Sequence, residues 1–101
     1  MLKGAFRDGI RRRLRLPLIA APMFLVSGVE LVVAACRSGV IGAFPTANCR
    51  TSDQLDLWLD EIRRRLRDQE DAAGVAAAPY CTNLIVHKSN PRLAEDSTCG
   101  R

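Results

Sequence analysis

Residues 16–45 read LPLIAAPMFLVSGVELVVAACRSGVIGAFP, and two apolar runs within this stretch decide the fold class. The first run covers residues 18–21 and ends at Pro22, and the second covers residues 40–44 and ends at Pro45. Short, continuous apolar runs between turn signals are typical of strands that are buried on both faces of a parallel sheet. The sequence therefore predicts two such strands.

A helix is expected between these two strands. Ser27 and Glu30 have the spacing of a capping box, in which the serine caps the first turn and the glutamate reaches back to the cap. The helix should end at Gly39, because glycine readily adopts the left-handed conformation that follows a last turn. A second capping box, from Thr51 to Gln54, predicts another helix. The apolar residues that follow it share one helical face: Leu55, Trp58, Leu59, Ile62 and Leu66.

A third strand is expected at residues 80–86, and Asn90 with Pro91 predicts the start of a further helix. Strands that alternate with helices are typical of a parallel sheet, and we predict an α/β fold with strand order following the chain. The open doubly wound sheet and the eight-stranded barrel both use this unit, with their chemistry at the carboxyl ends of the strands. The chain lacks the glycine fingerprints of dinucleotide-binding and phosphate-loop proteins, which excludes both classes.

Composition sets further limits. The chain has 101 residues, of which 48% are hydrophobic, and a formal net charge of +4. This hydrophobic share excludes a disordered tail and favours one compact domain. No apolar run reaches the ~18 residues of a membrane-spanning helix, so we expect no membrane partner and a cytoplasmic location. Four cysteines and a single histidine offer few ligands for structural zinc, and we expect no metal.

The basic excess is concentrated in residues 1–15, which we interpret as an N-terminal arm. The pentapeptide RRRLR occurs at residues 11–15 and again at 63–67. Two such clusters on one face would suit a basic nucleic-acid-binding module, which is an alternative function of another class. Acidic residues flank the second cluster and would repel phosphate: Asp60, Glu61, Asp68, Glu70 and Asp71. We therefore interpret this cluster as a solvated helix face and expect no nucleic-acid partner.

Export is a further alternative. The first basic cluster precedes an apolar run over residues 16–26, and residues 33–36 (VAAC) look like a lipoprotein cleavage box. Pro17 and Pro22 interrupt the run, and Glu30 lies between the run and the box. A signal peptide needs an uninterrupted apolar segment close to its cleavage site, so these features argue against export.

At the expected strand ends the chain resembles the N-terminal part of the nitronate monooxygenases, flavin enzymes formerly called 2-nitropropane dioxygenases. The similar segments are residues 16–24 (LPLIAAPMF), 30–46 (ELVVAACRSGVIGAFPT) and 82–96 (TNLIVHKSNPRLAED). Many flavin barrels carry the Ala-Pro-Met triplet, and its combination with Gly-Val-Ile-Gly and Asn-Leu in the next two strands is more specific. The resemblance implies that residues 16–96 are the N-terminal portion of an FMN-binding (β/α)8 TIM barrel.

The activity implied by the resemblance is that of a flavin-dependent oxidoreductase. Members of the family oxidise alkyl nitronates with O2 and release a carbonyl compound and nitrite. Relatives in the same superfamily reduce quinones with NAD(P)H or reduce enoyl thioesters. All three classes share these N-terminal motifs, so the substrate stays open between nitronate, quinone and enoyl compound.

Carried over to this chain, the family pattern assigns the backbone at Ala21, Pro22 and Met23 to the isoalloxazine ring of FMN, and the Asn83 side chain to a hydrogen bond with that ring. These residue types suit the role, because a flavin site needs an apolar wall and a few polar groups aimed at the ring. Core packing of Met23 and a strand-end cap at Asn83 are the structural alternatives.

Two further residues are candidates for contacts on the substrate side of the flavin. His87 and Lys88 follow the third expected strand, where strand-end positions favour function. The catalytic histidine of the family would fall beyond residue 101, so no catalytic residue is assigned. We interpret Cys36, Cys49 and Cys81 as small buried or half-buried hydrophobes.

The last five residues, 97–101 (STCGR), depart from the family, which continues with an apolar helix. A complete barrel typically needs ~250 residues, so this length holds about three of its eight strands. We therefore expect residues 97–101 to be a divergent tail, and the chain to be a fragment whose reading frame is interrupted near Ser97. The same reasoning predicts little or no activity for the 101-residue chain alone.

Overall fold

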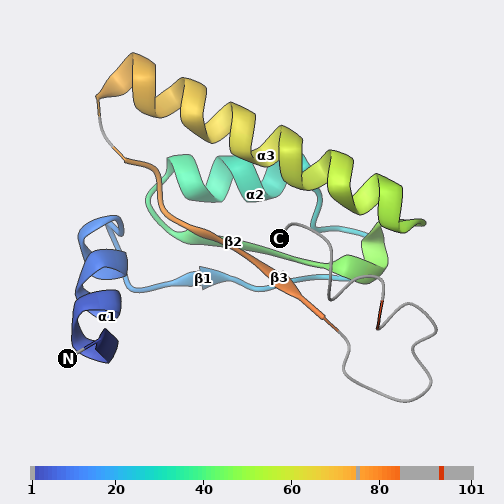
Figure 1. The fold of residues 1–101 in the computed structure, drawn as a ribbon, viewed down its shortest axis with the longest axis horizontal. Coiled ribbons are helices and arrows are strands. Elements are labelled where there is room, and N and C mark those ends of the chain that lie inside the picture. Colours follow the sequence, from blue (N-terminus) through green and yellow to red (C-terminus); the bar gives the residue numbers. More distant parts are fainter. Residues whose placement is uncertain (1, 75, 85–93, 95–101) are drawn as a thin grey trace.

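The structure is a computed structural model that describes residues 2–74, 76–84 and 94. Helix α1 (Leu2–Arg12) comes first, followed by β1 (Ile19–Ala20), α2 (Val29–Arg37) and β2 (Ile41–Pro45). A 3-10 turn, η1 (Thr46–Asn48), leads into the long helix α3 (Ser52–Ala73) and then β3 (Tyr80–Asn83). The result is a small α/β fold (Figure 1).

The three strands form one parallel sheet in the order β1-β2-β3. Ile19 pairs with Ile41 on one side of β2, and Pro45 pairs with Asn83 on the other. The predicted parallel order is therefore confirmed. Helices α2 and α3 both lie on the same face of the sheet (Figure 1), as two right-handed crossovers between consecutive strands require.

The core lies between this sheet face and the two helices. Phe44 of β2 is fully buried, and its ring lies 5.5 Å from that of Trp58 on α3, centroid to centroid. Helix α2 contributes Val32, Val33 and Cys36, and α3 contributes the predicted stripe of Leu55, Leu59, Ile62 and Leu66. Burial of these side chains gives the main stabilising free energy, at about 25 cal/mol per Å² of apolar surface.

Helix α2 passes very close to the sheet at Gly42. A Cβ atom at this position would lie 2.6 Å from the carbonyl oxygen of Val32 and 2.9 Å from its Cα atom. Both atoms belong to the backbone and cannot rotate away. Glycine is therefore needed here for space, and it allows α2 to pack directly on β2.

The first predicted capping box is wrong. Helix α2 starts after Gly28 and has no side-chain cap. The hydroxyl of Ser27 is buried and accepts from the amide of Met23 at 2.8 Å. It therefore stabilises the turn before the helix and does not cap α2. Glu30 turns outward to Arg65 of α3 at 2.7 Å. The predicted C-terminal glycine is correct, because Gly39 follows the helix with a φ of 89°.

The second capping site is confirmed at Thr51, whose side chain accepts from the amide of Gln54 at 3.1 Å. Gln54 reaches back one residue further than expected, to the amide of Arg50 at 2.6 Å. Helix α3 also continues past the apolar stripe through the polar residues 68–71, and it ends at the left-handed Gly74. Hydrogen bonds within the helix suffice here, since no glycine or proline interrupts residues 68–73.

The strands differ from prediction in length and burial. Strand β1 has only two paired residues, and Ile19 is 62% exposed, so the prediction that this strand is buried on both faces is wrong. It pairs with β2 alone, at the edge of the sheet. Pro45 was expected to stop β2 and instead is its last residue. Strand β3 ends at Asn83, three residues before the predicted end.

Helix α1 covers most of the basic arm, for which no secondary structure was predicted. Within the described residues no helix is both long enough and apolar enough to cross a membrane.

Candidate functional site

The carboxyl ends of the three strands lie at one edge of the sheet (Figure 1). Three segments meet there: the loop of residues 21–28 after β1, the turn η1 after β2, and the end of β3. In parallel α/β folds this edge carries the ligand site, because the loops above it can vary without disturbing the core. We take this edge as the candidate functional site.

Asn48 holds the loop after β1 in place. Its Oδ1 accepts from the amide of Leu25 at 2.8 Å, and its Nδ2 donates to the carbonyl oxygens of Met23 at 3.0 Å and Ser27 at 2.7 Å. One side chain from η1 thus satisfies three backbone groups that lie more than 20 residues earlier. Such anchoring fixes the loop in one conformation.

Ser27 supports the same loop from inside. Its hydroxyl accepts from the amide of Met23 and donates to the carbonyl of Ala21 at 3.5 Å. The amide of Ser27 in turn donates to the carbonyl of Met23 at 2.9 Å. The loop is therefore preorganised around Met23 by hydrogen bonds from both sides.

Leu25 sits at the tip of this loop in an unusual conformation. Its φ is 63°, and it is the only non-glycine residue with a positive φ among the described residues. Its side chain is 80% exposed, so packing does not explain the conformation. A left-handed leucine costs roughly 1–2 kcal/mol, and the hydrogen bond from its amide to Asn48 offsets part of that cost. Strain of this kind is often found beside ligand sites.

The predicted ring-contact residues lie in this loop. Ala21, Pro22 and Met23 follow β1 directly and are all exposed, with Met23 at 44%. Core packing of Met23, the structural alternative, is thereby excluded. Phe24 and Val26 are exposed beside it. The loop thus presents a largely apolar surface at the sheet edge.

Asn83 is the last residue of β3 and is also exposed. Its Cα partner is Pro45, and the neighbouring pair, Thr82 with Phe44, faces the helices. Since side chains alternate along a strand, Asn83 lies on the sheet face away from α2 and α3. Strand β2 separates it from the loop after β1, so about 10 Å of sheet width lies between the two predicted contacts.

His87 and Lys88 lie outside the described residues, as do the tail at residues 97–101 and the helix expected after Asn90.

The cysteines differ in burial. Cys36 and Cys49 are buried, as predicted, whereas Cys81 is exposed, which corrects that prediction for this residue. Cys81 pairs with Ala43 and so points to the face away from the helices. Burial raises the pKa of the Cys36 thiol, and this effect outweighs a hydrogen bond from the Gly42 backbone and the charge of Arg13. A raised pKa disfavours the reactive thiolate.

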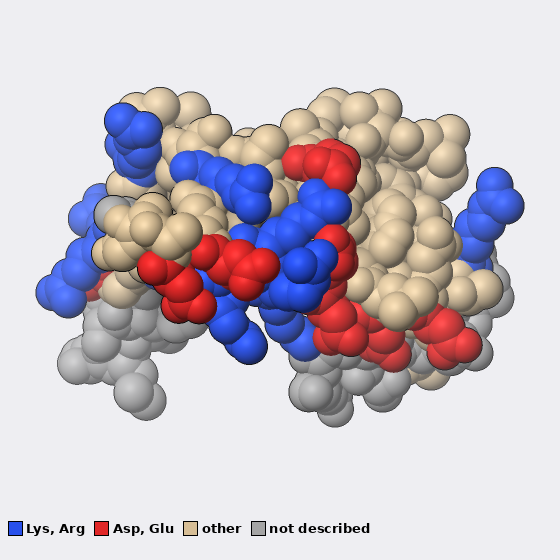
Figure 2. Space-filling view, turned by 90° about the horizontal axis from the view of Figure 1, so that it is seen from above, with Lys and Arg blue, Asp and Glu red and all other residues tan. Residues whose placement is uncertain are grey.

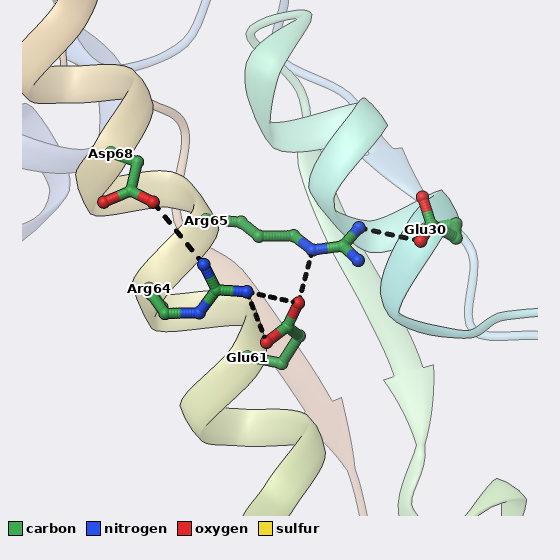
Figure 3. A network of polar contacts seen from close by, with 5 residues as sticks. All are labelled: Glu30, Glu61, Arg64, Arg65 and Asp68. Carbon is green, nitrogen blue, oxygen red and sulfur yellow. Dashed lines mark hydrogen bonds and ion pairs between the residues drawn. The ribbon is translucent and has the colours of Figure 1, made fainter.

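The second RRRLR cluster forms part of an ion-pair network on α3 (Figure 3). Arg64 makes two contacts of 2.7 Å to the carboxylate of Glu61. Arg65 bridges Glu61 and Glu30, each at 2.7 Å, and so links α3 to α2. Figure 2 shows the mixed charges along this surface. The interpretation of this cluster as a solvated helix face is confirmed.

These contacts shift the pKa values of the network. Hydrogen bonds from Arg64 and then Arg65 lower the pKa of Glu61. The same carboxylate raises the pKa of Arg64, and Glu30 followed by Glu61 raises that of Arg65. These directions keep Glu61, Arg64 and Arg65 charged near neutral pH.

Sequence reasoning missed Asn48, the residue that organises the candidate site. Its position just after a strand, in Pro45-Thr46-Ala47-Asn48, is a place where an amide side chain often bonds nearby backbone. That signal indicates a turn but does not reveal the partner, because the bonded loop is distant in sequence.

Comparison of the chain with protein-family models, with curated proteins and with solved structures gave no match. Within the described residues, no group of three or more His, Cys, Asp or Glu side chains could hold a metal ion.

Proposed function

We propose that the carboxyl edge of this sheet is the ring-binding part of an FMN site, and that the chain forms the first three strand–helix units of a (β/α)8 barrel. The proposed reaction is the oxidation of an alkyl nitronate by O2 to a carbonyl compound and nitrite. It rests on the sequence resemblance together with the geometry of this edge. Reduction of a quinone or an enoyl compound at the same edge is the alternative within the superfamily.

One observation carries the proposal. The loop of Ala21, Pro22 and Met23 and the side chain of Asn83 lie at the same edge, with Asn83 on the face away from the helices. In a (β/α)8 barrel the helices lie outside and the opposite face of the sheet turns inward. Asn83 would then point into the barrel, beside the loop.

The residues of this edge fit the ring of a flavin. Exposed Met23 offers a polarizable, unbranched side chain to a flat aromatic surface. Asn83 carries both a donor and an acceptor, which suits ring nitrogens and carbonyls. Asn48 and Ser27 hold the loop rigid, so little conformational entropy would be lost on binding. When bound, FMN would supply the electron-accepting chemistry of the reaction.

We assign to the described residues only the part of the site that contacts the isoalloxazine ring, and not the part that binds the phosphate of FMN. In barrels of this kind the phosphate end is commonly bound after the seventh and eighth strands. We therefore expect the 101-residue chain to bind FMN weakly. We do not propose nucleic-acid binding, because Arg64 and Arg65 of the second basic cluster are paired with the carboxylate of Glu61.

An NMR titration of the isotope-labelled 101-residue chain with FMN tests this proposal. We expect the amide signals of Ala21, Met23 and Asn83 to shift together, with fast exchange and low affinity. Asn83→Ala should weaken binding by about tenfold, because a polar contact of this kind is worth roughly 1–3 kcal/mol. Shifts confined to α1, or no shifts at all, would contradict the proposed site.

Thr82→Ala is the matched control. Thr82 is the neighbouring residue of β3, is also exposed, and lies on the helix-facing side of the sheet. FMN affinity should be unchanged in this variant. An equal loss in both variants would mean that the strand, and not the Asn83 amide, determines binding. His87→Ala should also weaken binding less than Asn83→Ala.

A further inference from the structure

A cavity of about 130 Å³ lies at the opposite edge of the sheet, where the strands begin. It is bounded by the segment before β1, the turn between α2 and β2, and the segment before β3. Four arginines line it, Arg12, Arg13, Arg15 and Arg37, together with Gln69 of α3. This amino-terminal pocket is separate from the proposed flavin edge.

Two of the arginines are held in place by backbone contacts. Arg13 donates through Nε to the carbonyl of Ala77 at 2.9 Å. Arg15 lies across Gly39, where a Cβ atom would come within 2.3 Å of the Arg15 Cγ atom. The amide of Arg15 also donates to the carbonyl of Gly39 at 2.8 Å. Neither contact uses the terminal nitrogens of the two guanidinium groups.

The positive charges of the pocket are not neutralised. In the part of the chain that the structure describes, no ion pair involves any of the four arginines, whereas Arg63, Arg64 and Arg65 of α3 are all paired. Glu70 of α3 is already engaged, because its Oε1 accepts from the amide of Ala77 at 3.1 Å. Among the described residues that line the pocket there are four guanidinium groups and no carboxylate, so the lining is net positive.

A simpler explanation for two of these arginines is that they stabilise helix ends. Arg12 and Arg37 are the last residues of α1 and α2, and a positive charge is favourable at the carboxyl end of a helix. Three carbonyl groups in the last turn of α2 are already satisfied, however. The amides of Ser38, Gly39, Val40 and Ala78 donate to the carbonyls of residues 34–36. The arginines are therefore not needed as caps at this end.

Gln69 gives an independent indication of a ligand. Its Oε1 atom is buried and has no hydrogen-bond partner among the residues that the structure describes. A buried acceptor without a donor costs roughly 1–3 kcal/mol. A ligand that neutralises the arginines and also donates one hydrogen bond would satisfy both features. Hydrogen phosphate does this through its P–OH group, whereas sulfate carries no proton at neutral pH.

We propose that the amino-terminal pocket binds a protonated phosphate group, with guanidinium groups of Arg12, Arg13, Arg15 and Arg37 around its oxygens and Gln69 accepting from its hydroxyl. The group is inorganic phosphate, which keeps a P–OH at neutral pH, whereas a phosphomonoester has a second pKa of about 6 and is mostly unprotonated there. The volume of about 130 Å³ suits the phosphate group itself, whereas pockets that take up a whole drug-sized ligand have about 300–1,000 Å³. Exposed Asp68 and Asp71 on the same turn of α3 would repel an extended nucleic-acid backbone.

Isothermal titration calorimetry of the 101-residue chain in chloride buffer at neutral pH tests the site. Inorganic phosphate, methyl phosphate and sulfate are titrated separately. We expect saturable one-to-one binding, with inorganic phosphate bound more tightly than both sulfate and methyl phosphate. Methyl phosphate that binds as tightly as inorganic phosphate would show that the hydroxyl is not recognised and would overturn the role of Gln69. Equal affinity for sulfate, or no saturable binding in the millimolar range, would overturn the proposal.

Variants locate the site. Arg12→Gln and Arg37→Gln should each weaken phosphate binding by about tenfold, the usual cost of one charge-assisted contact. Gln69→Leu should remove the preference for phosphate over sulfate. The control is Arg7→Gln, which changes the same charge on the same helix as Arg12 but lies outside the pocket. Equal weakening in the control, or displacement of phosphate by a short DNA duplex in both proteins, would show only general attraction of anions.

Discussion

Gly42 decides how closely helix and sheet approach each other in this protein. Its missing Cβ leaves room for the backbone of Val32, and its φ is not positive, so space and not backbone conformation is the requirement. We expect Gly42→Ala to destabilise the fold by about 1–3 kcal/mol, the usual cost of overpacking a core. Urea unfolding followed by circular dichroism measures this change.

Gly9→Ala is the control for this prediction. Gly9 lies within α1, and no described atom outside this helix's own backbone and the two chain neighbours lies within 4 Å of the position that its Cβ would occupy. Alanine has the higher helix propensity, by about 1 kcal/mol, so this variant should be as stable as the wild type or more stable. A loss at Gly9 as large as that at Gly42 would refute the steric explanation.

At the scale of elements, the network of Figure 3 joins α2 to α3 and predicts a pH dependence. The pKa of Glu61 is lowered in the folded protein. Such a carboxyl group stabilises the fold above its unfolded pKa, and this contribution is lost as the pH falls through the folded pKa. The wild type should therefore melt at a higher temperature than Glu61→Gln at neutral pH, and the difference should vanish as the pH falls below the ordinary value of 4.5.

The difference should be small, because exposed ion pairs contribute little and salt screens them. Asp56→Asn serves as the control: Asp56 is exposed on the same helix and has no ion pair within the described residues. At neutral pH this variant should melt closer to the wild type than Glu61→Gln does. A pH-independent difference for Glu61→Gln would mean that the ion pairs of Glu61 with Arg64 and Arg65 do not stabilise the fold.

The sequence predicts an element well when the signals for that element, such as apolar spacing or a terminal glycine, lie within its own residues. Leu55, Leu59 and Ile62 repeat at helical spacing, and Gly39 and Gly74 mark helix ends by their conformation. The hydrogen-bond partner of Ser27 could not be predicted. Its hydroxyl can accept either from the amides of the following helix or from the amide of Met23, and the sequence does not distinguish the two.

The candidate site could be predicted only in part, for a related reason. The exposure of Met23 and the position of Asn83 follow from where strands end. The three hydrogen bonds of Asn48 and the convergence of arginines around Gln69 arise between segments that meet only in the folded chain. Local sequence patterns do not predict contacts between segments that are distant in the chain.

At the scale of the whole molecule, exposed apolar side chains are concentrated along β1 and the loop after it. They are Leu16, Leu18, Ile19, Met23, Phe24, Leu25 and Val26. Contiguous apolar surface of this kind usually marks a site of interaction. The dye anilinonaphthalene sulfonate, which fluoresces on apolar surface, should therefore bind the native chain, and the double variant Ile19→Ser with Phe24→Ser should reduce its fluorescence.

Leu57→Ser provides the comparison, because Leu57 is just as exposed but lies among polar neighbours on α3. Dye fluorescence should be nearly unchanged by this substitution. If it falls as far as in the double variant, the dye reports scattered apolar side chains and the surface around β1 has no special role.

The chain order of the sheet also bears on how the protein is made. Each strand pairs with the next one along the chain, so the sheet can grow by addition as residues leave the ribosome in order. The unit of β1, α2 and β2 is complete once Pro45 has emerged. Its buried ring, Phe44, stays uncovered until Trp58 and the rest of the α3 stripe have followed. That interval is when the nascent chain is most exposed to association with its neighbours.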